Sequence, residues 1–236
     1  TCQEYHECET DSHCITKLGW EYACADVTYS KTKWPSFEPI GASEKSGTSL
    51  TGTIAEFLNR YPVKLIVVAC NTATAAAVQL LRDNLVIPIV GLEPALKPAV
   101  ESSQNKKIGV LATQATLQSD KYKQLRERFS GQVAITEKAS PLFVELVESA
   151  YKIGDKEFVL IQTELQPFIE AKVDSLVLGC THFPILKAEI QQALGKTIQL
   201  IDSGEAIARR AKALASALNS SMVHPSKIAS TSYFST

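Results

Sequence analysis

Two stretches of the chain share one plan, and that plan restricts the fold more than any other feature. Residues 65–74 and 176–186 each begin with an apolar run, pass through a small residue to a cysteine, and continue into a stretch that favours helix. Apolar runs of this length predict buried parallel strands. Cys70 and Cys180 then follow the carboxyl ends of strands, where open α/β sheets place their ligands, and precede helix N-termini, which favour a thiolate.

The chain from about residue 53 onward alternates between strand and helix patterns. Strands are predicted at 64–69, 87–90, 107–113, 132–136, 175–179 and 198–201, and helices at 75–82, 116–129, 141–151, 156–171, 184–194 and 205–218. This alternation predicts an α/β fold of mostly parallel sheets flanked by helices. Residues 219–236 are rich in Ser and Thr without a periodic apolar face, so we expect a disordered tail.

Composition excludes several classes of function. The formal net charge is −1, which gives no long-range attraction to nucleic acid or to an anionic membrane. No apolar run approaches the ~20 residues of a membrane helix, and the first twenty residues lack the apolar core of a signal peptide. We therefore expect a cytoplasmic protein with no membrane and no direct nucleic-acid partner.

The N-terminal segment carries four of the six cysteines. They are interleaved with two histidines, in the order Cys2, His6, Cys8, His13, Cys14 and Cys24. Zinc and disulfides are both alternatives, but the cysteine gaps of five, five and nine residues contain no Cys-x2–4-Cys pair. A reducing compartment also disfavours disulfides. The preferred interpretation is that these thiols have no specific role.

Five ordered motifs resemble those of the glutamate racemase family. The two cysteine motifs are Val68–Ala75 and Leu178–Leu186, and the supporting motifs are Val90–Ala99, Ile108–Thr113 followed by Ala115 and Thr116, and Ile201–Ala206. The resemblance runs from about Ile54 to about Leu218. It implies two similar lobes with the active site between them, the first built from residues 1–95 and 205–218 and the second from 96–204.

The first fifty residues depart from the family pattern. The family has an Asp-Ser-Gly loop after its first strand, where this chain has Asp11 and Ser12 followed by His13. The family's Pro-Tyr-Gly substrate loop is matched here only by Pro39-Ile40-Gly41. Asp11, Ser12 and Gly41 are therefore candidates for the site on position alone.

Racemisation of an amino acid requires two acid/base groups on opposite faces of the α-carbon. The resemblance assigns these roles to Cys70 and Cys180, one as the thiolate base and the other as the thiol acid, and the roles reverse for the other enantiomer. A free thiol has a pKa near ~8.5 and needs assistance to ionise at neutral pH. The family uses a histidine and an acidic residue for this, and His182 and Glu148 stand at the matching positions.

The remaining predicted site residues would bind the substrate. The resemblance implies contacts from Asn71, Thr72, Thr181 and His182, and Thr113 and Thr116 are further candidates from the second lobe. The family uses no pyridoxal phosphate and no metal, so no cofactor is expected. Each residue alone has a simpler interpretation, since a single buried cysteine usually packs as a small apolar side chain. The paired motifs make catalysis the preferred interpretation.

The resemblance leaves three functions open. The leading hypothesis is cofactor-independent conversion of L-glutamate to D-glutamate for bacterial peptidoglycan, by a chain that binds glutamate and forms a homodimer. The second is a racemase of aspartate or a related amino acid. The third is a catalytically impaired family member that acts as a binding protein, because its first lobe departs from the pattern. A thiol redox enzyme is disfavoured, since the chain has no Cys-x-x-Cys motif.

Overall fold

The computed structural model describes residues 3–5, 58, 63–149, 152–218 and 233–235. Its contacts divide the chain into two compact units. The first unit contains residues 1–67, 76–90 and 208–236, and the second unit contains residues 68–75 and 91–207. Both cysteine motifs therefore belong to the second unit.

The first unit contains most of a small two-stranded sheet and the larger parts of two helices, α4 (Asn71–Asn84) and α11 (Gly204–Leu218). Strand β2 (Ile66–Val68) pairs with β3 (Ile89–Gly91), and helix α4 continues into this unit from the second. The helix predicted at 75–82 is confirmed within α4, and its residues Ala77, Val78 and Leu81 are buried. Most of the predicted tail lies outside the described residues, but β8 (Tyr233–Ser235) pairs antiparallel with β1 (Gln3–Tyr5).

The second unit is built on a four-stranded parallel sheet. Its strands run in the order β5-β4-β6-β7, and their bounds are Ala134–Ala139, Lys107–Ala112, Ser175–Gly179 and Gln199–Ile201. Every pair of neighbours is parallel. Strands β4 and β6 lie in the centre and are almost completely buried, as expected for strands covered on both faces.

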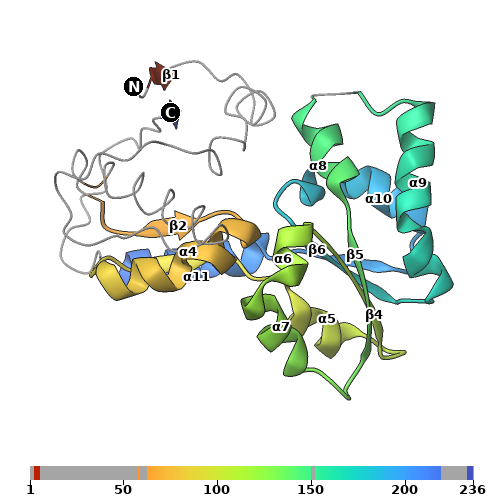
Figure 1. Cartoon of the computed structure of the whole chain (residues 1–236), viewed down its shortest axis with the longest axis horizontal. Helices are drawn as coiled ribbons and strands as arrows, with labels where there is room; N and C mark the ends of the chain where they lie inside the picture. Colours follow the sequence, from red (N-terminus) through yellow and green to blue (C-terminus); the bar gives the residue numbers. More distant parts are fainter. Residues whose placement is uncertain (1–2, 6–57, 59–62, 150–151, 219–232, 236) are drawn as a thin grey trace. The chain divides into compact units, whose positions relative to one another are not determined.

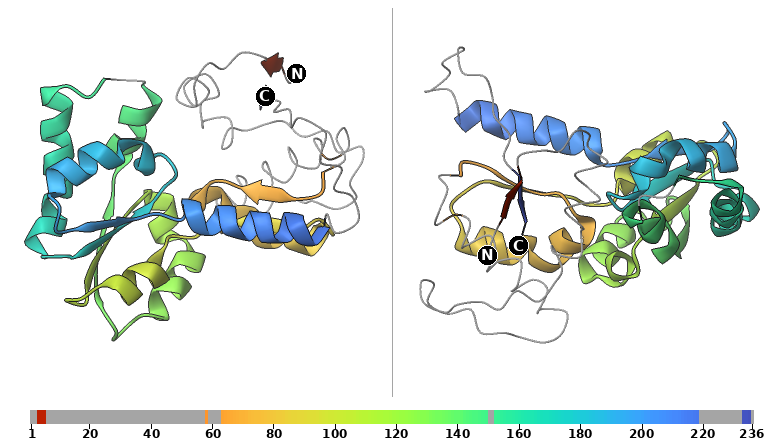
Figure 2. Two further views of the ribbon diagram at one scale, coloured as in Figure 1. Left: turned by 180° about the vertical axis from the view of Figure 1, so that it is seen from behind. Right: turned by 90° about the horizontal axis from the view of Figure 1, so that it is seen from above.

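Helices cover both faces of this sheet (Figures 1 and 2). The helices of the second unit are α5 (Leu96–Ser102), α6 (Gln114–Gln118), α7 (Asp120–Glu127), α8 (Pro141–Glu148), α9 (Asp155–Glu170), the 3-10 turn η1 (Phe183–Leu186) and α10 (Lys187–Leu194), and α11 (Gly204–Leu218) begins in it. Figure 2 shows α5 and α7 on one face and α9 and α10 on the other. A right-handed crossover places its helices on opposite faces of a sheet when the chain moves in opposite directions across it. The chain moves in one direction from β4 to β5 and in the other from β5 to β6.

One glycine allows the two central strands to approach closely next to the second cysteine. A Cβ added to Gly179 would lie 3.0 Å from the Cβ of Ala112 and 3.2 Å from the carbonyl oxygen of Leu111. Both distances are shorter than ordinary carbon contacts. The small residue before Cys180 is therefore required where the carboxyl ends of β4 and β6 meet.

The α/β class with parallel sheets flanked by helices is confirmed, and three elements differ from the predictions. The single helix predicted at 116–129 is wrong, because α6 ends and α7 begins at Ser119, whose hydroxyl accepts from the Tyr122 N–H. The motif Val90–Ala99, for which no helix was predicted, contains the start of helix α5, in which Leu96 and Ala99 are buried. Strand β5 also begins and ends later than the predicted 132–136.

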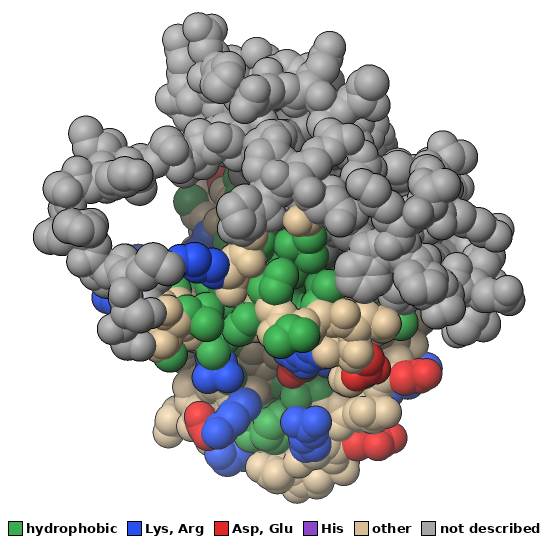
Figure 3. Space-filling view, turned by 90° about the vertical axis from the view of Figure 1, so that its left-hand side faces the viewer, with side chains coloured by type: hydrophobic (Ala, Val, Ile, Leu, Met, Phe, Trp, Pro, Cys, Tyr) green, Lys and Arg blue, Asp and Glu red, His purple; other side chains and the backbone are tan. Residues whose placement is uncertain are grey.

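The described surface has no single dominant charge on the face drawn in Figure 3. Apolar, basic and acidic side chains are interspersed over the described part of that face. This agrees with the balanced formal charge of the sequence. Among the helices in the described part of the chain, none is long and apolar enough to cross a membrane.

Candidate active site

The first cysteine lies in the turn between β2 and α4. Cys70 immediately precedes α4 and is half-buried. Its sulfur accepts a hydrogen bond from the backbone N–H of Ala73 at 3.4 Å, so it occupies the position of a helix N-cap. A donated N–H at a helix N-terminus stabilises negative charge on sulfur. The turn therefore holds Cys70 in a setting that suits a thiolate base.

The second cysteine follows β6 and lies in a more enclosed setting. Cys180 is 8% exposed and is a thiol. Burial raises the pKa of Cys180 to about 11; the charge of Cys70 adds to the rise, and the backbone N–H groups of His182, Thr181 and Phe183 oppose it. At neutral pH, Cys180 therefore keeps its proton and is suited to act as the acid.

A histidine and a glutamate connect to the second cysteine in series. Nδ1 of His182 lies 3.4 Å from the sulfur of Cys180, and Nε2 lies 2.6 Å from Oε1 of Glu148. A carboxylate only accepts hydrogen bonds, so Nε2 donates to Glu148, and Nδ1 is the ring nitrogen that faces the thiol. The predicted group of Cys180, His182 and Glu148 therefore lies together in one chain of contacts.

Aromatic packing brings the glutamate to the histidine. The buried rings of Phe143 on α8 and Phe183 on η1 meet edge to face, with centroids 5.6 Å apart. This contact fixes α8, which ends at Glu148, against the turn that contains His182. Thirty-four residues of sequence separate the two members of the pair, so tertiary packing makes the contact.

The two cysteines belong to the same compact unit and interact electrostatically. The contacts place 68–75 with 91–207, and the charge of Cys70 is one of the causes that raise the pKa of Cys180. A negative charge on Cys70 therefore disfavours a thiolate at Cys180. The partition implied by the resemblance, with Cys70 in the lobe of residues 1–95 and Cys180 in the lobe of residues 96–204, stays a prediction.

Three predicted threonines form a closed group of hydroxyls. Oγ1 of Thr72 lies 2.9 Å from that of Thr113 and 3.1 Å from that of Thr116. The Thr113 hydroxyl also donates to Thr116 at 2.9 Å and caps α6 by accepting from the Thr116 N–H. Each of these hydroxyls can exchange its bond to a neighbouring threonine for a bond that it donates to a ligand carboxylate. The group joins the start of α4 to the carboxyl end of β4.

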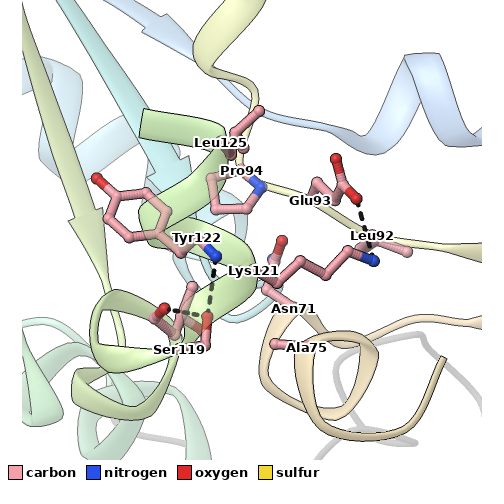
Figure 4. A pocket seen from close by; sticks show the side chains of 10 residues that line it. Asn71, Ala75, Leu92, Glu93, Pro94, Ser119, Lys121, Tyr122 and Leu125 are labelled. Carbon is pink, nitrogen blue, oxygen red and sulfur yellow. Dashed lines mark hydrogen bonds and ion pairs between the residues drawn. The ribbon is translucent and has the colours of Figure 1, made fainter. Parts of the chain in front are cut away.

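Asn71 lies at the edge of a small pocket (Figure 4). The residue is 5% exposed, and its Oδ1 has no hydrogen-bond partner among the described residues. A buried amide oxygen without a donor is costly, so it is suited to accept from a ligand ammonium or hydroxyl. Thr181 is half-buried beside Cys180, and its backbone N–H is one of the groups that favour the Cys180 thiolate.

The pocket also contains an ion pair that the sequence analysis missed. Nζ of Lys121 lies 3.1 Å from Oε1 of Glu93, and Figure 4 shows both side chains at the pocket with Asn71 and Tyr122. Glu93 lies within one of the five motifs, but no signal in the sequence points to Lys121. The two residues are 28 positions apart, and a lysine in a polar helix usually faces solvent.

The N-terminal candidates lie outside the described residues. These are Asp11, Ser12 and Gly41, together with the segment of Cys2, Cys8, Cys14 and Cys24. Within the described ranges, no group of three or more His, Cys, Asp or Glu side chains is arranged to hold a metal ion. The described part of the site consists of two thiols, one histidine–carboxylate pair, one asparagine and three threonine hydroxyls.

Comparison with known proteins decides the family. The Asp/Glu/Hydantoin racemase profile matches residues 25–211, which is most of the chain. This chain belongs to that racemase family. The match begins before Ile54, so it reaches further toward the N-terminus than the resemblance in the motifs does.

Within the racemase family, the chain is similar to several bacterial glutamate racemases. It is 43% identical over 156 residues to one from Ralstonia nicotianae, covering 66% of this chain and 56% of that protein. It is 38% identical over 177 residues to one from Herpetosiphon aurantiacus, covering 75% and 70%. The chain thus spans little more than half the length of the first of these relatives.

A solved structure agrees with this placement. The glutamate racemase of Escherichia coli, described in complex with L-glutamate and the activator UDP-MurNAc-ala, matches with a TM-score of 0.68 and 35% identity. The match covers 74% of this chain and 66% of that structure. The prediction from the two cysteine motifs, that the chain has the fold and family of a glutamate racemase, is confirmed.

Proposed function

We propose that this chain interconverts L- and D-glutamate, with Cys70 and Cys180 as the two acid/base groups. The observation that carries the proposal is the difference between the two sulfurs. Cys70 accepts a hydrogen bond from the Ala73 N–H, whereas Cys180 is buried with a pKa raised to about 11. One base and one acid at neutral pH are what the removal and return of an α-proton require.

The first step uses Cys70 as the base. Its thiolate takes the proton from Cα of the bound amino acid, and the electron pair passes into the α-carboxylate. The Cys180 thiol then delivers its proton to the opposite face of the same carbon. The product leaves Cys70 as a thiol and Cys180 as a thiolate, so atoms and charge balance within one turnover.

The reverse direction needs a thiolate at Cys180. His182 accepts the proton of the Cys180 thiol, because its Nδ1 faces the sulfur and its Nε2–H donates to Glu148. A proton that moves from Cys180 to Nδ1 creates a positive ring between the thiolate and the carboxylate. Both neighbours stabilise that charge, and the racemase then begins from the other enantiomer.

The substrate would be bound by hydroxyls and amides. The hydroxyls of Thr72, Thr113 and Thr116 are placed to donate to a carboxylate, and Oδ1 of Asn71 is placed to accept from the ammonium. Similarity to proteins named glutamate racemases supports glutamate as the substrate. The proposal includes the predicted peptidoglycan role, cytoplasmic location and homodimer.

Circular dichroism of amino-acid solutions tests the proposal. The purified chain, without added cofactor, is incubated with L-glutamate, D-glutamate or L-aspartate, beside Cys70→Ala and Cys180→Ala variants. We expect the ellipticity of both glutamate enantiomers to decay toward zero, aspartate to change much less, and each variant to lose the activity. A folded parent chain that leaves glutamate unchanged contradicts the proposal and favours the impaired binding protein; faster decay with aspartate favours the aspartate racemase.

A further inference from the structure

The turn that carries Cys70 contains a buried hydroxyl with no role in the mechanism above. Thr74, one helical turn after Cys70, is 1% exposed. Its Oγ1 donates to the carbonyl oxygen of Val68 at 3.2 Å and accepts from the backbone N–H of Leu92 at 2.9 Å. Its own N–H donates to the carbonyl oxygen of Cys70 at 2.9 Å.

These bonds close the Cys70 turn into a rigid loop. Val68 ends β2, and Leu92 follows the end of β3, so one hydroxyl ties the helix to the ends of both strands. Val68 and Leu92 are each 6% exposed, so few other partners are available for their backbone groups. The position of the Cys70 sulfur therefore depends on the Thr74 side chain.

The second cysteine is held in a different way. The residue four positions after Cys180 is Pro184, which has no hydroxyl and no N–H. Cys180 is held instead by its contact with His182, which Glu148 orients. A change at Thr74 should therefore affect one sulfur, and a change at Glu148 should affect the other.

We propose that Thr74 is the positioning residue for Cys70 in the two-thiol reaction. This inference rests on the proposed racemase function. Loss of the hydroxyl lets the turn relax and moves the sulfur away from Cα, and displacements of about 1 Å cost roughly 10²-fold in rate. Thr74→Val should lower kcat/KM by about 10- to 100-fold, and Thr74→Ser, which keeps the hydroxyl, should restore most of it.

Isotope effects separate positioning from general destabilisation. The two enantiomers are equally stable, so kcat/KM falls equally in both directions and cannot show which sulfur is affected. The primary deuterium isotope effects with 2-deuterated L- and D-glutamate can show it. In Thr74→Val, the isotope effect should rise for the enantiomer deprotonated by Cys70 and fall for the other enantiomer. In Glu148→Gln, the isotope effect should fall for the enantiomer deprotonated by Cys70 and rise for the other enantiomer.

A second measurement does not depend on racemase activity. The rate of Cys70 alkylation by iodoacetamide, followed by mass spectrometry against pH, reports the setting of the sulfur directly. In Thr74→Val the profile should move to higher pH, because the N–H of Ala73 no longer points at the sulfur. If the parent chain does not racemise glutamate, the proposed function fails and this profile alone decides the role of Thr74.

Two further variants keep the test decisive. Ser175→Ala removes another buried hydroxyl, at the amino end of β6 and away from the cysteines, and should change neither the isotope effects nor the alkylation profile. Thr74→Ala leaves room for a water to satisfy Val68 and Leu92, so it should fold even if valine is not tolerated there. Unchanged isotope effects and an unchanged Cys70 profile in a folded Thr74→Val or Thr74→Ala protein overturn the inference.

Discussion

At the scale of single residues, the environment of each sulfur differs more than its sequence context does. Both cysteines follow a strand and precede a helical segment, yet Cys70 is half-buried with a backbone donor and Cys180 is enclosed beside His182. Burial is the largest cause of the raised pKa of Cys180, and the charge of Cys70 adds to it. Two similar motifs thereby place one sulfur in a setting suited to a base and the other in a setting suited to an acid.

The first prediction concerns the titration of Cys180. Its thiol should alkylate slowly at pH 7–9 and reach half of its maximal rate near pH 11, since burial disfavours the thiolate. Replacing Cys70 with alanine removes one negative charge, so the midpoint should move down, but burial should keep it above the ordinary value of 9.0. Alkylation with iodoacetamide, followed by mass spectrometry, measures both midpoints. A midpoint that does not move in Cys70→Ala contradicts the coupling between the two sulfurs.

The second prediction concerns the histidine–carboxylate pair. Glu148→Gln keeps a similar shape but removes the charge that stabilises a positive His182 ring, so kcat should fall by about 10²-fold, a typical value for lost acid–base assistance. Glu145→Gln changes an exposed glutamate of the same helix and serves as the matched control. Equal activity of the two variants in a glutamate racemisation assay would show that Glu148 has no part in proton transfer.

The sequence identified the chemical groups of the site but not all of their surroundings. Cys180 and His182 were predictable because they stand within a strong motif, and Glu148 because it stands where the resemblance places an acidic residue. The hydrogen bond from Ala73 to Cys70 and the ion pair of Lys121 with Glu93 were not, because one is a backbone contact and the other joins two ordinary surface residues. Such features depend on how the chain packs, which residue types alone do not specify.

At the scale of elements, the boundaries follow local capping that residue types only partly reveal. The strands β4, β6 and β7 appear close to their predicted ranges because their apolar runs are long and continuous. Residues 116–129 contain good helix formers throughout, so a single helix was predicted there. Ser119 breaks it, since its hydroxyl donates to the carbonyl of Thr116 and accepts from the N–H of Tyr122. The Ser119-Asp120 pair is a recognisable N-cap signal that the apolar pattern concealed.

The third prediction concerns the end of helix α9. Lys172 follows the helix with φ of 55°, in the left-handed region that favours glycine. The N–H of Val173 donates to Phe168 and that of Lys172 donates to Ile169, which is the hydrogen-bond pattern of a Schellman motif. Lys172→Gly should therefore raise the free energy of unfolding by about 1 kcal/mol. Urea denaturation measures the change.

A matched lysine separates this effect from the loss of a charged side chain. Lys212 is exposed in the interior of α11, where glycine is unfavourable. Lys212→Gly should lower the free energy of unfolding by about 1 kcal/mol. The same sign of change in both variants would contradict the conformational explanation.

At the scale of the whole molecule, the topology of the second unit explains where the site forms. The chain moves from β4 to β5 on one side and then to β6 on the other side of β4. Ligands of open parallel sheets bind outside the carboxyl ends of strands at such a reversal. Thr113 follows β4 and Cys180 follows β6, so the three threonine hydroxyls and the buried thiol lie at this reversal.

The fourth prediction tests the central claim that two thiols act on opposite faces of one carbon. L-glutamate is incubated with the full chain in D₂O, and deuterium at Cα is measured separately in the L and D pools at low conversion, after chiral separation and mass spectrometry. We expect the new D-glutamate to carry deuterium from the second thiol while the remaining L-glutamate keeps its proton. Deuterium that appears equally in both pools would mean that a single base serves both faces, and the two-thiol account would be wrong.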